Sequence, residues 1–407
     1  MYYAIRFTPF LLVVNLGLGS QQHPLTFFGF PLNQIINWFV ILGASIVVKN
    51  TYPARLWPII TIACVISSKF LSTILGYPPP VELVYRVFLS GLFFTVGIIY
   101  LYRYLDLFYK QMLIICFFNV IMMVLQVTNA GEWTQFLSTE STFKYAEKIT
   151  YDVLFVPLEQ LQFSIIQGRP SGFLRSNNIL SGVLLFALAL HFSRFKNRRK
   201  WWGTFVLCSM IVLASARIVY VGYFVILVLL LLKGNKAQRK SLINSFILLL
   251  ILLQVYSFFL PGLFDRFWEY SNLTYSIFLR LNDIVGSLGT ENFLRILLEK
   301  PLEGTPIATW AAADEVLSGY TLLLNYVPYL VTLFLVLLPL YIRGIRIQNR
   351  IFPHLTWPSI LCLIVFILYP AAVPIFRDQF YWVIGGFALL PIFIMMQPNY
   401  FKRVVRP

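Results

Sequence analysis

The chain of 407 residues has little charge, few cysteines and few histidines, and each scarcity excludes a class of protein or site. Charged residues make up 12% of the sequence, whereas a soluble domain carries about 25%, so a soluble Rossmann or TIM-barrel domain is excluded. The four cysteines lie inside apolar runs, which offer neither a disulfide framework nor a CxxC metal site. The acidic residues are scattered, without a DxD, HExxH or paired-aspartate motif, and we therefore expect no metal and no cofactor.

Apolar residues dominate the chain, at 59% of the sequence with a mean hydropathy of +0.76. Because a membrane-spanning helix needs roughly 20 apolar residues, the sequence predicts an all-α, polytopic membrane protein with a single membrane domain over 1–407. Apolar runs bounded by charges and turn residues give about twelve transmembrane helices. The predicted spans are 4–20, 30–48, 56–75, 83–101, 111–128, 172–192, 201–214, 218–232, 241–259, 321–341, 355–373 and 381–396.

Basic residues are concentrated in the connections on one side of the predicted bundle. With both termini in the cytoplasm, 20 of the 32 basic residues but only one acid, Asp106, lie on the cytoplasmic side. This asymmetry follows the positive-inside rule. The net charge of +16 therefore predicts topology and contacts with membrane lipids, and it does not indicate a nucleic-acid partner.

Two connections on the opposite side are much longer than the others: loop A at 129–171 and loop B at 260–320. Loops of this length are uncommon unless they are functional. Both contain many aromatic residues in amphipathic stretches, so we expect them to form interfacial helices over the bundle. The sequence contains no internal repeat, which gives no support to a transporter built from inverted repeats.

Several arginines lie on the outer side, where the positive-inside rule depletes them. Arg217 is at the tip of a predicted hairpin between two spans, and Arg169 and Arg175 flank the start of the sixth span. Arg280 and Arg295 lie in loop B. A guanidinium binds diphosphate through paired hydrogen bonds and stays charged. For any one arginine, contact with lipid phosphates or a loop carboxylate is the simpler interpretation, whereas the group as a whole favours a functional site.

Three stretches resemble the signature motifs of the O-antigen ligase and polymerase superfamily. The stretch GRPSGFLRSNNILSGVLL at 168–185 resembles the pattern R-x-x-G-x-F-x-N-P-N. Its matching residues, in order, are Arg169, Gly172, Phe173 and Asn177, with Asn178 in place of the usual proline. LASARIVYVG at 213–222 is similar to the second motif, a Ser-Arg entering a span, through Ser215 and Arg217 with one residue inserted between them. LLEKPLEGTP at 297–306 is similar to the third, an amphipathic helix ending in Pro-Leu-x-Gly.

The resemblance implies a glycosyltransferase of the membrane-embedded GT-C type, in the bacterial inner membrane, with its active site on the periplasmic side. Its substrates are then undecaprenyl-diphosphate-linked glycans. Ligases of this family share a histidine in the second large periplasmic loop. The corresponding loop here is loop B at 260–320, which contains no histidine. This absence favours the O-antigen polymerase branch. An O-antigen ligase that transfers to lipid A core, and a lipid-linked oligosaccharide flippase, are the alternatives.

The resemblance also assigns roles to the outer residues. As catalytic residues we expect Arg217, Arg280 and Glu315, and as diphosphate-binding residues Arg169, Arg175 and Arg295. The base is chosen from the acids of loop B, which are Asp283, Glu291, Glu299, Glu303, Asp314 and Glu315. Glu315 and its neighbour Asp314 lie nearest to the expected motif position. A chain-length regulator and a flippase are possible partners by resemblance alone. The sequence gives neither the sugar linkage nor the kind of polysaccharide.

Overall fold

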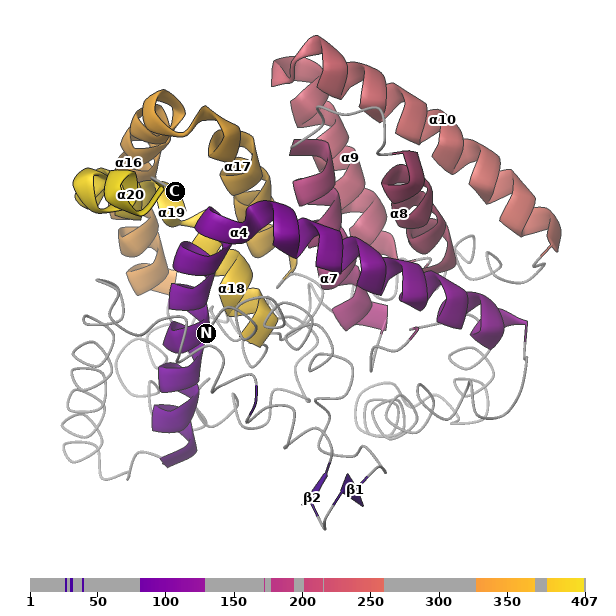
Figure 1. The fold of residues 1–407 in the computed structure, drawn as a ribbon, viewed down its shortest axis with the longest axis horizontal. Coiled ribbons are helices and arrows are strands. Elements are labelled where there is room, and N and C mark those ends of the chain that lie inside the picture. The colour runs from indigo at the N-terminus through magenta and orange to yellow at the C-terminus, as the bar shows by residue number, and fades with distance from the viewer. Residues whose placement is uncertain are drawn as a thin grey trace, which may run out of the picture. The chain divides into compact units, whose positions relative to one another are not determined.

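The computed structural model describes residues 26–27, 30–31, 39, 81–128, 172, 177–193, 201–214, 216–259, 327–369 and 379–405 (Figure 1). Nearly all of them are helical, which confirms the all-α class for this part of the chain. The exception is an antiparallel pair of two-residue strands, β1 (Thr26–Phe27) and β2 (Phe30–Pro31). Loops A and B and almost all of the first three predicted spans lie outside the described residues.

The chain divides into two compact units, and helix α4 (Val81–Val127) contributes to both. Unit 1 contains 41–105 and 276–407, and unit 2 contains 2–40 and 106–275. The backbone of Tyr104, with φ −120° and ψ 29°, departs from helical values next to this boundary. The sequence predicted separate spans at 83–101 and 111–128, and the kink at Tyr104 divides α4 into two helical segments in this region. The second segment begins before its predicted start at 111, because the charged residues that precede 111 are helical as well.

Unit 2 contains the second half of α4 and four helices that follow the predicted spans closely. These are α7 (Asn177–Ser193), α8 (Trp201–Ala214), α9 (Arg217–Lys233) and α10 (Lys236–Phe259). Only α10 begins well before its predicted start at 241. Its start is set by a capping box, in which Gln238 N–H donates to Asn235 Oδ1 and Asn235 N–H donates to Gln238 Oε1, both at 2.9 Å.

Unit 1 contains the first half of α4 and five C-terminal helices. These are α16 (Val327–Ile351), α17 (Pro353–Leu368), α18 (Gln379–Ala388), α19 (Leu390–Met396) and α20 (Pro398–Val405). The predicted span 381–396 is divided into two helices at Leu389, two residues before Pro391, whose ring is tolerated only in the first turn of a helix. Helix α16 continues ten residues beyond its predicted end at 341, and α20 was not predicted.

Glycines bring α4 and α18 into backbone contact within unit 1. A Cβ at Gly97 would lie 2.1 Å from the carbonyl oxygen of Val383, and a Cβ at Gly386 would lie 1.9 Å from that of Phe94. Small residues allow helix backbones to approach this closely, which increases van der Waals contact between them. Gly97 and Gly386 therefore fix where these two helices cross.

We expect Gly386→Ala to lower the free energy of unfolding by about 3 kcal/mol, because a methyl group there meets backbone rather than a movable side chain. Thermal denaturation in detergent measures the loss. The matched control is Gly385→Ala, whose Cβ would meet the ring of Phe366, which can shift. Equal losses at the two positions would contradict the proposed backbone contact.

Two helical stretches are long and apolar enough to cross a membrane: Tyr104–Val127 of α4 and the whole of α10. Along α10, large apolar side chains that recur every three or four residues are exposed. They are Ile243, Phe246, Ile247, Leu250, Ile251, Val255, Phe258 and Phe259. Soluble proteins rarely expose a continuous apolar face of this length, so α10 indicates membrane association.

Candidate functional site

Of the six predicted site residues, the structure describes Arg217. Arg169, Arg175, Arg280, Arg295 and Glu315 lie outside the described residues. Two further motif positions are described: Gly172, and the backbone of Asn177, the first residue of α7. The candidate site is therefore built from Gly172, Arg217 and the helices of unit 2 that hold them.

Hydrogen bonds show which ends of the unit 2 helices lie together. Shortly after its kink at Tyr104, α4 contacts the C-terminal end of α7 through Tyr109 and His191, and near its end it contacts Gly172 through Gln126. Helices α4 and α7 are therefore antiparallel. Gln238, just beyond the end of α9, donates to the carbonyl of Ser193 at the end of α7.

Helices α7 and α9 are consequently parallel, and Gly222 in the first half of α9 packs against Leu185 in the middle of α7 (Figure 1). It follows that α7 and α9 begin at the same end of unit 2, where α4 ends. We call this the Gly172–Arg217 end. Two motifs that are 45 residues apart in the sequence thus lie at one end of the same unit.

Gly172 is anchored to α4 by the side chain of Gln126. Gln126 Nε2 donates to the carbonyl oxygen of Gly172 at 2.9 Å, and the Gly172 N–H donates to Gln126 Oε1 at 2.9 Å. The side-chain carboxamide of Gln126 therefore forms hydrogen bonds with both the N–H and the carbonyl of Gly172. Gln126 is 8% exposed, and a buried pair of this kind is expensive to break.

The conformation of Gly172 explains why the motif has glycine at this position. Its φ is +65°, in the left-handed region that favours glycine. A Cβ there would lie 2.3 Å from Asn119 Oδ1. Asn119 is buried about two turns before the end of α4 and donates to the carbonyl of Ile115 at 2.9 Å. Asn119 and Gln126 are seven residues apart, so they share one face of α4, and Gly172 lies against that face.

Arg217 is the first residue of α9 and is half-buried. Ala216 before it is extended and makes no side-chain cap. Partial burial lowers the pKa of the Arg217 guanidinium, which stays charged because its ordinary pKa lies so far above neutral pH. The positive end of the α9 dipole adds to this charge. The arrangement suits an anion such as a phosphate.

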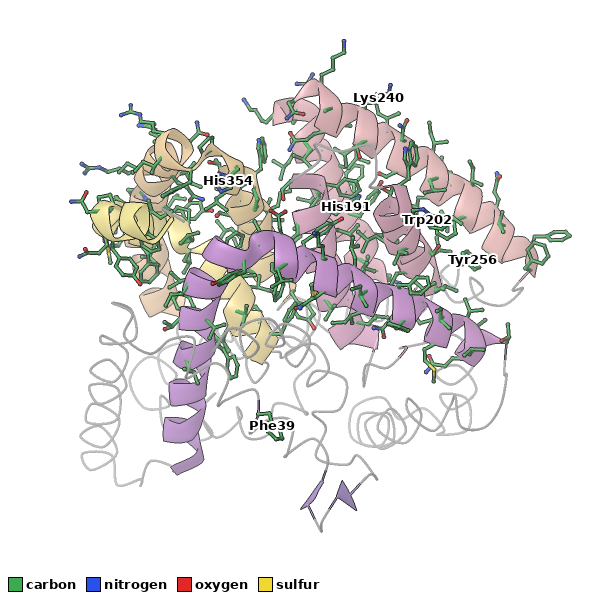
Figure 2. All side chains as sticks on the ribbon, in the orientation of Figure 1. Phe39, His191, Trp202, Lys240, Tyr256 and His354 are labelled. Carbon is green, nitrogen blue, oxygen red and sulfur yellow. The ribbon has the colours of Figure 1, made fainter. Side chains whose placement is uncertain are left out.

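The opposite end of unit 2 carries a different set of groups. Its exposed cations lie at the end of α9 and the start of α10, and they are Lys233, Lys236, Arg239 and Lys240. Figure 2 labels Lys240. Trp201 and Trp202, at the start of α8, are 57% and 78% exposed. Lysine, arginine and tryptophan are typical of a membrane–water interface. The positive-inside rule predicts that this basic end is cytoplasmic and that the Gly172–Arg217 end lies on the other side.

His191, near the C-terminal end of α7, lies in a buried polar network at the basic end (Figure 2). Its Nδ1 bonds to Tyr109 Oη of α4, and its Nε2 bonds to Thr204 Oγ1 of α8 at 2.9 Å. The network ties three helices together at the end of unit 2 that lies away from the motifs.

We expect Tyr109→Phe to cost about 1–3 kcal/mol of stability, because it removes a hydrogen-bond partner from a buried imidazole. Tyr256→Phe, a half-exposed tyrosine of α10, is the matched control and should change stability by less than about 0.5 kcal/mol. Thermal unfolding in detergent compares them. Equal stability changes in the two variants would contradict a stabilising hydrogen bond between Tyr109 and His191.

Sequence analysis missed Asn119, Gln126 and Tyr109. The signal that marks the first two is a polar side chain inside an apolar span, which is rare unless it has a function. Among the described residues, no group of three His, Cys, Asp or Glu side chains is placed to hold a metal ion. No protein-family model, curated protein or solved structure matches the chain.

Proposed function

We propose that this protein is an O-antigen-type polysaccharide polymerase of the bacterial inner membrane. In this proposal it is a multi-pass GT-C-type glycosyltransferase with both termini in the cytoplasm, and its active site faces the periplasm. It transfers a growing glycan from undecaprenyl diphosphate to the non-reducing sugar of an incoming lipid-linked repeat unit. The motif resemblance supports the proposed substrate class, and the geometry of unit 2 supports the proposed location of the site.

The observation that carries the proposal is the shared position of Gly172 and Arg217. One belongs to the first motif and the other to the second, and both lie at the end of unit 2 away from the basic residues. A hydrogen bond to Gln126 holds Gly172 in place. In the sequence, Gly172 lies between Arg169 and Arg175. We therefore propose that the two arginines of the first motif, each three residues from Gly172 in the sequence, act together with Arg217.

In the proposed reaction, the acceptor hydroxyl oxygen attacks the anomeric carbon of the donor glycan. The bond from that carbon to the diphosphate oxygen breaks, and undecaprenyl diphosphate leaves with the bonding electron pair. The hydroxyl proton passes to a carboxylate, for which Glu315 is our candidate. A single displacement of this kind inverts the anomeric configuration.

Arginines perform the electrostatic part of the reaction. Negative charge on the diphosphate increases as the glycosidic bond breaks, and preorganised cations stabilise that charge more in the transition state than in the bound substrate. Arg217 and Arg280 are assigned this role. Arg169, Arg175 and Arg295 bind the diphosphate through paired hydrogen bonds. The proposed reaction is independent of metal ions.

The experiment uses purified full-length protein in detergent with synthetic undecaprenyl-diphosphate-linked repeat units and a chelator. We expect a ladder of lengthened glycans on a gel, and heat-denatured protein is the control. Glycan transfer to lipid A core without chain lengthening would show that the protein is a ligase and not a polymerase. Binding of the lipid-linked unit without either reaction would overturn the proposal in favour of a flippase.

A further inference from the structure

The last third of α16 has two faces of opposite character. Tyr341, Gly344 and Gln348 are buried, and a Cβ at Gly344 would lie 2.5 Å from the carbonyl oxygen of Pro391 in α19. Gln348 Nε2 also donates to Ser359 Oγ of α17 at 3.0 Å. These contacts fix the rotation of α16 within unit 1.

The other face carries three exposed arginines, Arg343, Arg346 and Arg350. Their spacing of three and then four residues places them on one side of the helix, along about 10 Å of its axis. We call them the arginine stripe. Because the opposite face is fixed against α19 and α17, the stripe is held outward by the fold.

The charge of the stripe has no counterpart in this part of the chain. Residues 327–369 and 379–405 contain five basic residues and no aspartate or glutamate. Two of the five, Lys402 and Arg403, belong to the short helix α20, which is anchored by the buried ring of Phe401. A carboxylate from α16–α20 therefore cannot neutralise the stripe, and the counter-charge comes from elsewhere.

The exposed surface next to the stripe shows what kind of partner fits. In the two turns of α16 that lead up to Arg343, the exposed side chains are apolar: Val336 is 56% exposed, Leu338 39% and Ile342 46%. The exposed surface of the helix thus changes from apolar to cationic at Ile342 and Arg343. Such a change is typical of a helix that passes from the hydrocarbon of a bilayer into its headgroup layer. A soluble acidic partner would not require the apolar part.

We propose that the arginine stripe is a binding site for anionic phospholipid headgroups. Each guanidinium donates to phosphate oxygens through its planar fork, while the acyl chains lie along Val336, Leu338 and Ile342. The site belongs to unit 1 and does not depend on the glycosyltransferase activity proposed for unit 2.

The test titrates phosphatidylglycerol or phosphatidylcholine into delipidated full-length protein in a neutral detergent, and native mass spectrometry counts the bound lipids. We expect wild-type protein to prefer phosphatidylglycerol. Replacing Arg343, Arg346 and Arg350 together by glutamine should weaken its binding about fivefold per arginine removed, with phosphatidylcholine binding unchanged. Replacing the three by lysine keeps the charge and should give an intermediate loss.

The matched control removes three cations from unit 2 through Lys233→Gln, Lys236→Gln and Lys240→Gln. It should reduce phosphatidylglycerol binding less than the arginine variant does. An equal reduction would show a response to net charge alone and would overturn the site. Unchanged binding in the folded arginine-to-glutamine variant would do the same. If soluble glycerol phosphate displaces the lipid at equal concentration, the site recognises a free phosphate and the lipid assignment is wrong.

Discussion

Replacing Arg217 by alanine is expected to reduce glycan transfer about 100- to 1,000-fold, the loss typical of removing one preorganised charge-stabilising group from an active site. Arg217 begins α9, where the helix dipole and the guanidinium are both positive. If it stabilises the departing diphosphate, the loss falls on kcat and kcat/KM together. Chain lengthening of synthetic lipid-linked repeats, followed over time, measures both constants.

Two variants separate this role from a general effect of charge. Arg217→Lys keeps the charge but not the planar fork, so we expect partial activity. Arg239→Ala removes an arginine from the opposite end of unit 2, where its Nε donates to the carbonyl oxygen of Gly234 at 3.0 Å. That variant should transfer glycan at nearly the wild-type rate. Wild-type activity in Arg217→Ala protein would remove Arg217 from the catalytic residues.

The helices that could be predicted from the sequence are those whose ends carry local signals. Helix α8 begins and ends at the predicted residues, because it follows the basic run before Trp201 and stops at the short turn before Arg217. A charged stretch was misread as a connection at the end of α16, where Arg343 to Arg350 is helical. Its three arginines occupy one helical face, a pattern compatible with a helix that leaves the membrane. In α4 the predicted break corresponds to the kink at Tyr104, but the helix resumes before the predicted start at 111.

The candidate site was predictable only where a motif is local. The glycine of the first motif is in the sequence, and a positive φ is the usual reason for such a glycine. Its partner could not be derived, because Gln126 lies 46 residues earlier and nothing in the intervening sequence specifies the pairing. The same holds for Tyr109 and His191, which are 82 residues apart. Tertiary contacts of this kind depend on how the helices pack, which periodicity does not give.

The second large effect concerns the anchor of the first motif. We expect Gly172→Ala to cost about 1–2 kcal/mol from the left-handed backbone alone, and more from the approach of its Cβ to Asn119 Oδ1. Gln126→Met keeps the volume but leaves the Gly172 N–H and carbonyl without their partner, at about 1–3 kcal/mol for each group left unpaired. Thermal unfolding of the purified protein measures these losses.

The activity of these variants tests whether the anchor positions the arginines as well as stabilising the fold. Gln238→Met is the matched control, because Gln238 is also a buried glutamine that donates to backbone carbonyls, but at the basic end. If the anchor positions Arg169 and Arg175 for diphosphate, Gln126→Met raises KM for the lipid-linked donor, whereas Gln238→Met lowers stability with an unchanged KM. The double variant Gly172→Ala with Asn119→Ala removes the clash between the new Cβ and Asn119 Oδ1. It should therefore recover the stability lost to that clash, but not the stability lost to the left-handed backbone. Equal KM values in the two glutamine variants would show that the hydrogen bonds between Gln126 and Gly172 stabilise the fold but do not position the arginines.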